Sequence, residues 1–269
     1  MSVRLRLRRG PGLRLDLRGI TPAALAGLDA AAIERLPLAQ GRGVLPLAEF
    51  FDVRVNGEAD SLHFEGDLSR CDRIGWQLTG GRVVVEGSAG DHAGAGMTAG
   101  ELHIHGDAGL LAACEMAGGQ LVVDGNVGDF AASAQPGSLD GMRGGSFIVR
   151  GNAGARFGDR MRRGTVLVFG DAGDFFASRL VAGSIALGGR AGAHVGYGMR
   201  RGSLVFARVA PSVPATFVPA ISEAPVIWQL LARDLARHGG PFAELPSRRV
   251  QRYLGDLAAG GKGELILIE

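Results

Sequence analysis

The chain has 269 residues, a net charge of +2 at pH 7 and only 6% aromatic residues. This composition argues against a dedicated nucleic-acid binder, because such proteins need a strongly basic surface or aromatic platforms on which bases stack. The first nine residues lack an apolar run, and nowhere do eighteen apolar residues follow one another. We therefore expect no signal peptide, no membrane span and a cytoplasmic location.

Residues 1–60 are the first of three predicted regions, an N-terminal cap of strands and short helices. Apolar and charged residues alternate over 3–8 and 13–18, which predicts two strands joined by the Gly10–Gly12 turn. Thr21 followed by Pro22 predicts a helix start, with Thr21 as its cap and Pro22 at the first position. A second short helix is expected over 30–36, followed by extended chain over 38–55.

Residues 61–209, the second region, repeat a short apolar strand that ends in glycine, mostly every nineteen residues. Two and four residues before each closing glycine the side chain is apolar, so both rows share the strand face that lines an interior. One strand and no helical pattern in each copy predict a mostly β fold, a single-stranded right-handed β-helix of about seven turns. The closing glycines are Gly66, Gly87, Gly106, Gly125, Gly151, Gly170 and Gly189.

Other repeated positions predict how each turn bends. A second glycine follows three residues after the closing one, and we expect such pairs to make corners with positive φ. The longer interval before Gly151 predicts a projecting loop over Ser133–Asp140. Ten residues past the closing glycine stand expected core residues: Met97, Met116, Met161, Leu180 and Met199.

The outward strand face carries one polar and one apolar row. The polar row, immediately before the closing glycines, includes Glu65, Glu86, His105 and Asp124. The apolar row needs a cover, either a terminal segment of this chain or another protein. We treat four of its members as a candidate subunit interface: Val84, Val122, Ile148 and Leu167.

Residues 210–269, the third region, form a predicted C-terminal helical cap and tail. Proline-rich extended chain leads to a helix over 225–238; residues 249–259 look helical, and 264–269 read as a final strand. A stack of repeats exposes open ends, so we expect the terminal regions to cap them, and one of them could cover the apolar row.

Candidate chemistry is sparse. His103 and His105 face outward from one strand, but a metal site needs a third ligand, and His63 in the row of His103 is roughly 10 Å away. We therefore expect exposed or interface histidines and no metal in this chain. No residue has a nucleophile signature, so no catalytic residue is expected. Cys71 and Cys114 are expected as buried free thiols in a reducing compartment.

Arginines recur at the corner that follows the methionine position, and we call the five of them the arginine edge: Arg143, Arg162, Arg163, Arg200 and Arg201. Stacked arginines could hold a polyanion through charge-assisted hydrogen bonds. They could also pair with acidic residues of a partner or form a solvated edge, and these three interpretations remain open. Five more arginines could extend the edge: Arg150, Arg156, Arg160, Arg179 and Arg190.

Repeats such as Gly151-Asn-Ala-Gly154-Ala-Arg-Phe-Gly158 resemble the GXGXG domain, which is also found at the C-terminus of the glutamate synthase large subunit. The flanks narrow the match. Leu15–Pro22, Ile33–Leu36 and the tail Arg252–Glu264 resemble the C subunit of formylmethanofuran dehydrogenase and its bacterial relative in the formyltransferase/hydrolase complex. The resemblance covers nearly the whole chain and implies a β-helical scaffold without a recognised catalytic motif.

In that family other subunits carry the chemistry. The resemblance implies a noncatalytic structural subunit in methylotrophic one-carbon metabolism, with amidohydrolase-like, formyltransferase-like and molybdoenzyme-like partners that hold any metal. The bacterial complex transfers formyl from formyl-tetrahydromethanopterin to a methanofuran-type cofactor and hydrolyses it to formate. The polyglutamate tail of that cofactor could lie on the arginine edge. Lys262 is the only lysine, which favours a GC-rich bacterial source and therefore this complex.

Three alternatives stand beside this interpretation. The first is the C subunit of a molybdenum or tungsten formylmethanofuran dehydrogenase, which is a redox complex. The second is an autonomous polyanion-binding module, stable without partners. The third, a left-handed β-helix acyltransferase, would repeat every eighteen residues or so and disagrees with the period and its glycine pattern.

Overall fold

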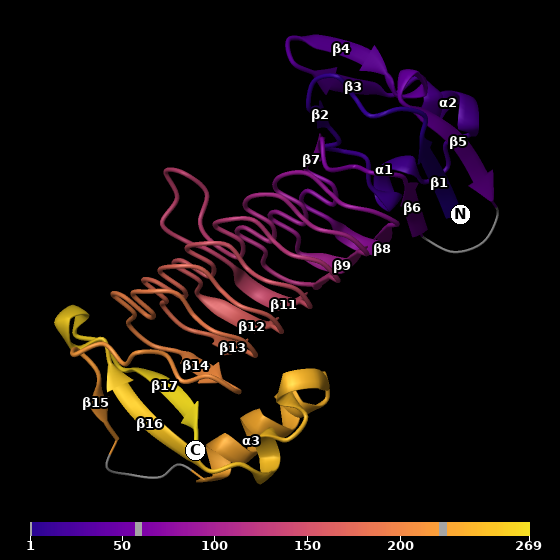
Figure 1. Ribbon diagram of the computed structural model, residues 1–269. Helices are drawn as coiled ribbons and strands as arrows, with labels where there is room; N and C mark the ends of the chain where they lie inside the picture. The colour runs from indigo at the N-terminus through magenta and orange to yellow at the C-terminus, as the bar shows by residue number, and fades with distance from the viewer. Residues whose placement is uncertain (1, 57–60, 221–224) are drawn as a thin grey trace.

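The computed structural model describes residues 2–56, 61–220 and 225–269 and is mostly β (Figure 1). A thirteen-stranded sheet has the order β15-β16-β17-β14-β13-β12-β11-β10-β9-β8-β6-β1-β5, and a four-stranded sheet has the order β4-β3-β2-β7. The elements in chain order are β1 (Ser2–Leu7), β2 (Leu15–Asp16), α1 (Pro22–Leu25), α2 (Ala30–Glu34), β3 (Pro37–Gln40), β4 (Gly43–Pro46), η1 (Leu47–Glu49), β5 (Phe51–Asn56), β6 (Ser61–Glu65), β7 (Cys71–Asp72), β8 (Thr79–Val85), β9 (Ala99–Ile104), β10 (Gln120–Val123), β11 (Arg143–Val149), β12 (Arg163–Val168), β13 (Ser184–Leu187), β14 (Ser203–Phe206), β15 (Val218–Pro219), α3 (Pro225–Ala236), η2 (Gly240–Phe242), η3 (Leu245–Ser247), β16 (Val250–Gly255), η4 (Leu257–Ala259) and β17 (Gly263–Ile268).

The strands of the repeat region are parallel and in register, each paired with the copies before and after it. Leu102 pairs with Leu121, which pairs with Phe147 on the following strand. Between one strand and the next the chain forms a loop, and the loops of successive copies are stacked side by side along the sheet (Figure 1). Both predicted inward rows are buried, with at most 1% of any side chain exposed from Leu62 to Leu187. The predicted methionine and leucine row is fully buried as well.

The closing glycines are required by close approach of neighbouring turns. Of the seven, only Gly66 has a φ in the left-handed region, at +115°, so the positive φ predicted for these corners is wrong. A Cβ on Gly151 would instead lie 2.5 Å from the carbonyl oxygen of Gly125, one turn earlier. Positive φ occurs elsewhere in the turns: at glycines where the next strand begins, such as Gly164 and Gly183 with φ of +106° and +107°, and at loop residues such as Arg156 and Arg160 with φ of +56° and +59°.

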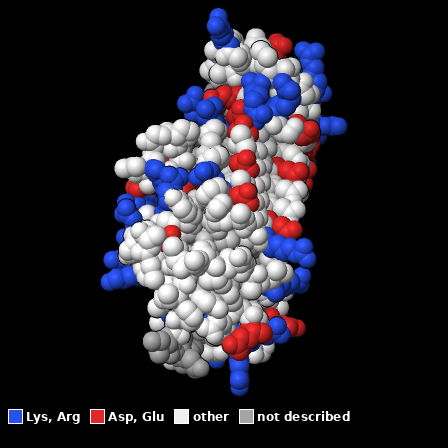
Figure 2. Space-filling model, turned by 60° about the vertical axis from the view of Figure 1, so that its left-hand side comes forward, with Lys and Arg blue, Asp and Glu red and all other residues white. Residues whose placement is uncertain are grey.

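Asp and Asn side chains next to the closing glycines hydrogen-bond the following turn. The backbone N–H of Asn126 donates to Asp107 Oδ1 at 2.6 Å, that of Asn152 to Asn126 Oδ1 at 2.9 Å, and that of Asp171 to Asn152 Oδ1 at 2.8 Å. These bonds satisfy backbone donors at the corners, which strand pairing leaves without a partner. On the face seen in Figure 2, acidic side chains form columns along the stack.

The N-terminal region adds strands to both sheets. β1 lies between β6, to which it is parallel, and β5, to which it is antiparallel. β2 pairs with β3 and β7 in the smaller sheet. The two strands predicted around the Gly10–Gly12 turn therefore exist, but they do not form a hairpin. Thr21 caps α1 as predicted, accepting a hydrogen bond from the backbone N–H of Ala24 at 3.3 Å.

The C-terminal region extends the large sheet at its other end. β17 pairs in parallel with β14 and antiparallel with β16. The predicted helix over 225–238 is α3, and the predicted final strand is most of β17. The helix predicted over 249–259 is wrong, because residues 250–255 pair with the free edge of β17 as β16. Within the described ranges, every helix is too short or too polar to cross a bilayer.

Candidate functional site

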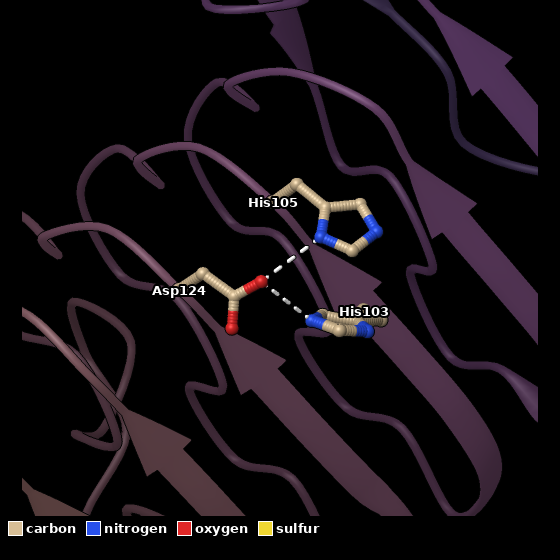
Figure 3. A group of neighbouring side chains, drawn as sticks. All are labelled: His103, His105 and Asp124. Atoms are coloured by element: carbon tan, nitrogen blue, oxygen red, sulfur yellow. Dashed lines mark hydrogen bonds and ion pairs between the residues drawn. The ribbon is translucent and has the colours of Figure 1, made fainter.

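Two histidines and an aspartate converge on the outward side of β9 and β10 (Figure 3). His103 and His105 are two residues apart, so their side chains share a face, and their ring centroids are 4.2 Å apart. Asp124 follows β10 in the row of His105. Its Oδ2 lies 2.8 Å from His103 Nε2 and 2.9 Å from His105 Nδ1. The side chain of His103 is 29% exposed, that of His105 41% and that of Asp124 31%.

Charged neighbours flank this group. Glu86 Oε2 lies 4.0 Å from His105 Nε2, and Arg150 Nε lies 3.7 Å from Asp124 Oδ1. Partial burial would raise the pKa of Asp124, but the hydrogen bonds from His103 and His105 outweigh it and hold this pKa below its usual value. The carboxylate is therefore ionised at neutral pH.

Asp124 is the member of this group that the sequence analysis did not place beside the histidines. The search for a third ligand followed the row of His103, in which His63 stands two strands away beyond Val84. The signal lay in the row of His105, because Asp124 comes nineteen residues after it, which is one turn of the stack. Among the described residues, these three form the one group of three or more His, Cys, Asp or Glu side chains whose ligand atoms lie close enough together to hold a metal ion.

The five residues of the arginine edge are exposed at the strand-entry corners of the stack. Arg143 and Arg163 are register partners on β11 and β12. Arg162 Nε lies 2.6 Å from Asp140 Oδ1 in the projecting loop. The register of β12, β13 and β14 puts Arg200 and Arg201 two turns beyond Arg162 and Arg163, or about 10 Å.

Lys262 joins the arginine edge from the C-terminal region. Its backbone N–H donates to the carbonyl oxygen of Arg200 at 2.6 Å, and its side chain is exposed. Four of the arginines predicted to extend the edge have partners elsewhere. Arg150 lies over Phe169, Arg156 lies over Phe175, Arg160 donates to the carbonyl of Ser138, and Arg179 pairs with buried Asp159.

The apolar outward row is covered largely by the chain itself. Leu167 and Ile148, 0% and 4% exposed, pack in one cluster with Trp228 and Leu235 of α3. These two residues are therefore unavailable to another subunit, which corrects their assignment to an interface. Val84, which pairs in register with His63 and His103, is also buried within the chain at 5% exposed, and this corrects its assignment to an interface.

Val122 is half-buried at the margin of the same cluster, and an interface there stays a prediction. The helix that covers the row also has an outer apolar side. Val226, Ile227 and Leu230 on α3 are 70%, 65% and 65% exposed.

The two cysteines are buried free thiols, as predicted. Burial raises the pKa of Cys71 and of Cys114 to about 12. Because the thiolate is the nucleophilic form, neither side chain is a nucleophile at neutral pH.

Comparison with known proteins relates the chain to multi-subunit enzymes. No protein-family model matches it. It is 42% identical over 86 residues to the C subunit of the formyltransferase/hydrolase complex Fhc of Methylorubrum extorquens. It is 39% identical over 84 residues to the C subunit of the molybdenum-containing formylmethanofuran dehydrogenase 1 of Methanosarcina barkeri. These alignments cover 32% and 30% of this chain and only 32% and 28% of the relatives' lengths.

The structural match extends over almost the entire chain. The crystal structure of the formyltransferase/hydrolase complex FhcABCD from Methylorubrum extorquens, in complex with methylofuran, contains a chain that superposes with a TM-score of 0.92. The two are 41% identical, and the match covers 98% of each chain. The chain thus belongs to the family of C subunits of formyltransferase/hydrolase complexes and formylmethanofuran dehydrogenases.

Proposed function

We propose that this chain is the noncatalytic structural C subunit of a formyltransferase/hydrolase complex in one-carbon metabolism. The observation that carries the proposal is the 41% identity and TM-score of 0.92 over 98% of a chain from such a complex. The complex transfers a formyl group from formyl-tetrahydromethanopterin to a methanofuran-type cofactor and hydrolyses it to formate. Partner subunits of the metal-dependent hydrolase, formyltransferase and molybdoenzyme-like types carry out the chemistry.

The scaffold of this subunit is a right-handed β-helix formed by residues 61–209, with caps over 1–60 and 210–269. Parallel register at a nineteen-residue spacing and the bridges between successive loops support this organisation. The right hand follows from the strong preference of parallel crossover connections for it. A rigid stack of strands joined by short loops presents flat sides on which partner subunits can assemble.

Assembly with partners tests the proposed function. Expressed alone, the chain should self-associate, because the outer side of α3 exposes Val226, Ile227 and Leu230. Co-expression with the hydrolase, formyltransferase and molybdoenzyme-like subunits should give a soluble complex that retains this chain through affinity purification and gel filtration. A monodisperse chain that stays behind when the other subunits co-purify would contradict the proposal.

The arginine edge holds the polyglutamate tail of the cofactor within this complex. Arg143 and Arg163 lie on adjacent turns, and Arg200 is next to Lys262 two turns beyond Arg162, so cations lie along one edge of the stack with one turn, uncharged at this edge, between the two groups. Guanidinium groups bind carboxylates through short charge-assisted hydrogen bonds, and a chain of carboxylates can engage several of them at once.

Reversing four of these charges should release the cofactor. We expect the complex with R162E, R163E, R200E and R201E to retain methanofuran-type cofactor at least about tenfold less than the wild type, measured by mass spectrometry of the purified complex. The matched control reverses the exposed Arg9, Arg42, Arg248 and Arg249, which changes the net charge equally. Unchanged retention in an intact complex would assign the edge another role and leave the subunit assignment standing.

A further inference from the structure

We propose that His103, His105 and Asp124 form a binding site for a divalent transition-metal ion, Zn²⁺ above all. The three ligand atoms are His103 Nε2, His105 Nδ1 and Asp124 Oδ2, and all lie within 4.8 Å of one another (Figure 3). Two imidazole nitrogens and one carboxylate oxygen are a ligand set that zinc favours, with a fourth position left for water.

The arrangement needs little adjustment to accept the ion. Oδ2 of Asp124 lies 2.8 Å and 2.9 Å from the two imidazole nitrogens. Around a tetrahedral zinc ion, with bonds of about 2.0–2.1 Å, neighbouring ligand atoms are about 3.3 Å apart. Small side-chain rotations that move Asp124 Oδ2 away from each nitrogen by a few tenths of an ångström would reach this spacing. The three side chains are partly exposed, so an ion and a water molecule can reach them from solvent.

The charged residues around the three ligands also fit a metal site. A metal-bound histidine usually donates its other ring N–H to a carboxylate, and Glu86 Oε2 lies 4.0 Å from Nε2 of His105, the ring nitrogen that does not face Asp124. Oδ1 of Asp124, which the ion would not use, faces Arg150 at 3.7 Å. Each imidazole binds in its neutral form, and its remaining proton moves to the nitrogen that faces away from the ion. The ion would link the end of β9 to the end of β10, two successive turns of the stack.

The surrounding backbone places these ligands firmly. Asp124 N–H donates to the carbonyl of Ile104 at 2.9 Å, and His105 N–H donates to that of Val85 at 3.0 Å. His103 stands opposite Val122 in the parallel register of β9 and β10. Ladder bonds on both sides therefore hold the three Cα positions, and only side chains need to move when the ion binds.

Metal titration of the full chain tests the proposal. After treatment with a chelator, the wild type should bind one Zn²⁺ per chain by isothermal titration calorimetry, and Co²⁺ in its place should give the visible absorption of a tetrahedral site. H103Q, H105Q and D124N should each weaken Zn²⁺ binding at least tenfold. Zn²⁺ should also raise the Tm of the wild type but not of D124N, because an ion that binds only the folded chain stabilises it.

The matched control is H63Q. His63 occupies the same outward row as His103, two strands away, so its replacement should leave Zn²⁺ affinity unchanged. Circular dichroism of all variants checks that each is folded, and three separate single substitutions keep the test decisive if one of them is not. Equal Zn²⁺ affinity in wild type and D124N, or no binding by the folded wild type, would overturn the proposal.

Discussion

Replacing Phe176 by alanine should lower the free energy of unfolding by about 3–5 kcal/mol, the usual cost of emptying a fully buried aromatic site. Phe176 is 0% exposed and lies between two other rings of the interior. Its centroid is 5.8 Å from that of Phe157, nearly parallel to it, and 6.3 Å from that of Phe206. Stacked turns allow little collapse, because ladder hydrogen bonds hold the backbone on both sides of the cavity.

The neighbouring residue provides the control. Phe175 is half-buried on the outside, where its ring contacts His194 and Arg156. Phe175→Ala removes the same number of atoms but leaves no enclosed cavity, so it should cost less than half as much. Denaturant unfolding followed by circular dichroism measures both variants. Equal losses for the two would show that Phe176 does not support the interior in the way its burial indicates.

Gly151→Ala should destabilise the chain by about 3 kcal/mol or more, at the upper end of the cost of overpacking. The added Cβ would lie 2.5 Å from the carbonyl oxygen and 2.6 Å from the carbonyl carbon of Gly125. Both atoms belong to the backbone of the preceding turn, so relief requires the two turns to separate. Because Asn152 N–H bonds to Asn126 at this corner, separation also weakens that contact.

Gly80→Ala is the matched comparison for this prediction. Gly80 lies in β8 of the same sheet, a Cβ there would meet nothing within 4 Å, and its φ is not in the left-handed region. We expect Gly80→Ala to change stability by less than about 1 kcal/mol in either direction. The measurement is again the denaturant midpoint, and a Gly151→Ala chain as stable as Gly80→Ala would refute the close-approach explanation.

The sequence could predict the positions in space of those residues that recur at the same place in each repeat. Leu102, Leu121 and Phe147 share a position in the repeat, and the parallel register puts them side by side. The same spacing also predicts Asp124 beside His105, because Asp124 comes nineteen residues later in the same row. The glycine corners were located correctly but explained wrongly, because clash with a neighbouring turn is not visible in a single repeat.

For segments without a period, the sequence did not show which strand each would pair with, and in one case it did not show the type of structure. Residues 250–255 carry no signal that distinguishes a helix from a strand, and the open edge of β17 made them a strand. β1 and β2 were recognised as strands, yet they joined different sheets. Lys262 reached Arg200 only because β17 continues the sheet beyond β14.

The amino-acid sequence by itself determined the stack: its strand rows, its buried core and its cap at Thr21. It could do so because a regular repeat converts a fixed separation along the chain into contact in space. Tertiary structure alone decided which end of the chain covers Ile148 and Leu167, and where β1, β16 and Lys262 lie. Those contacts join segments far apart in sequence, and their energies depend on which edges and apolar surfaces the finished stack leaves open.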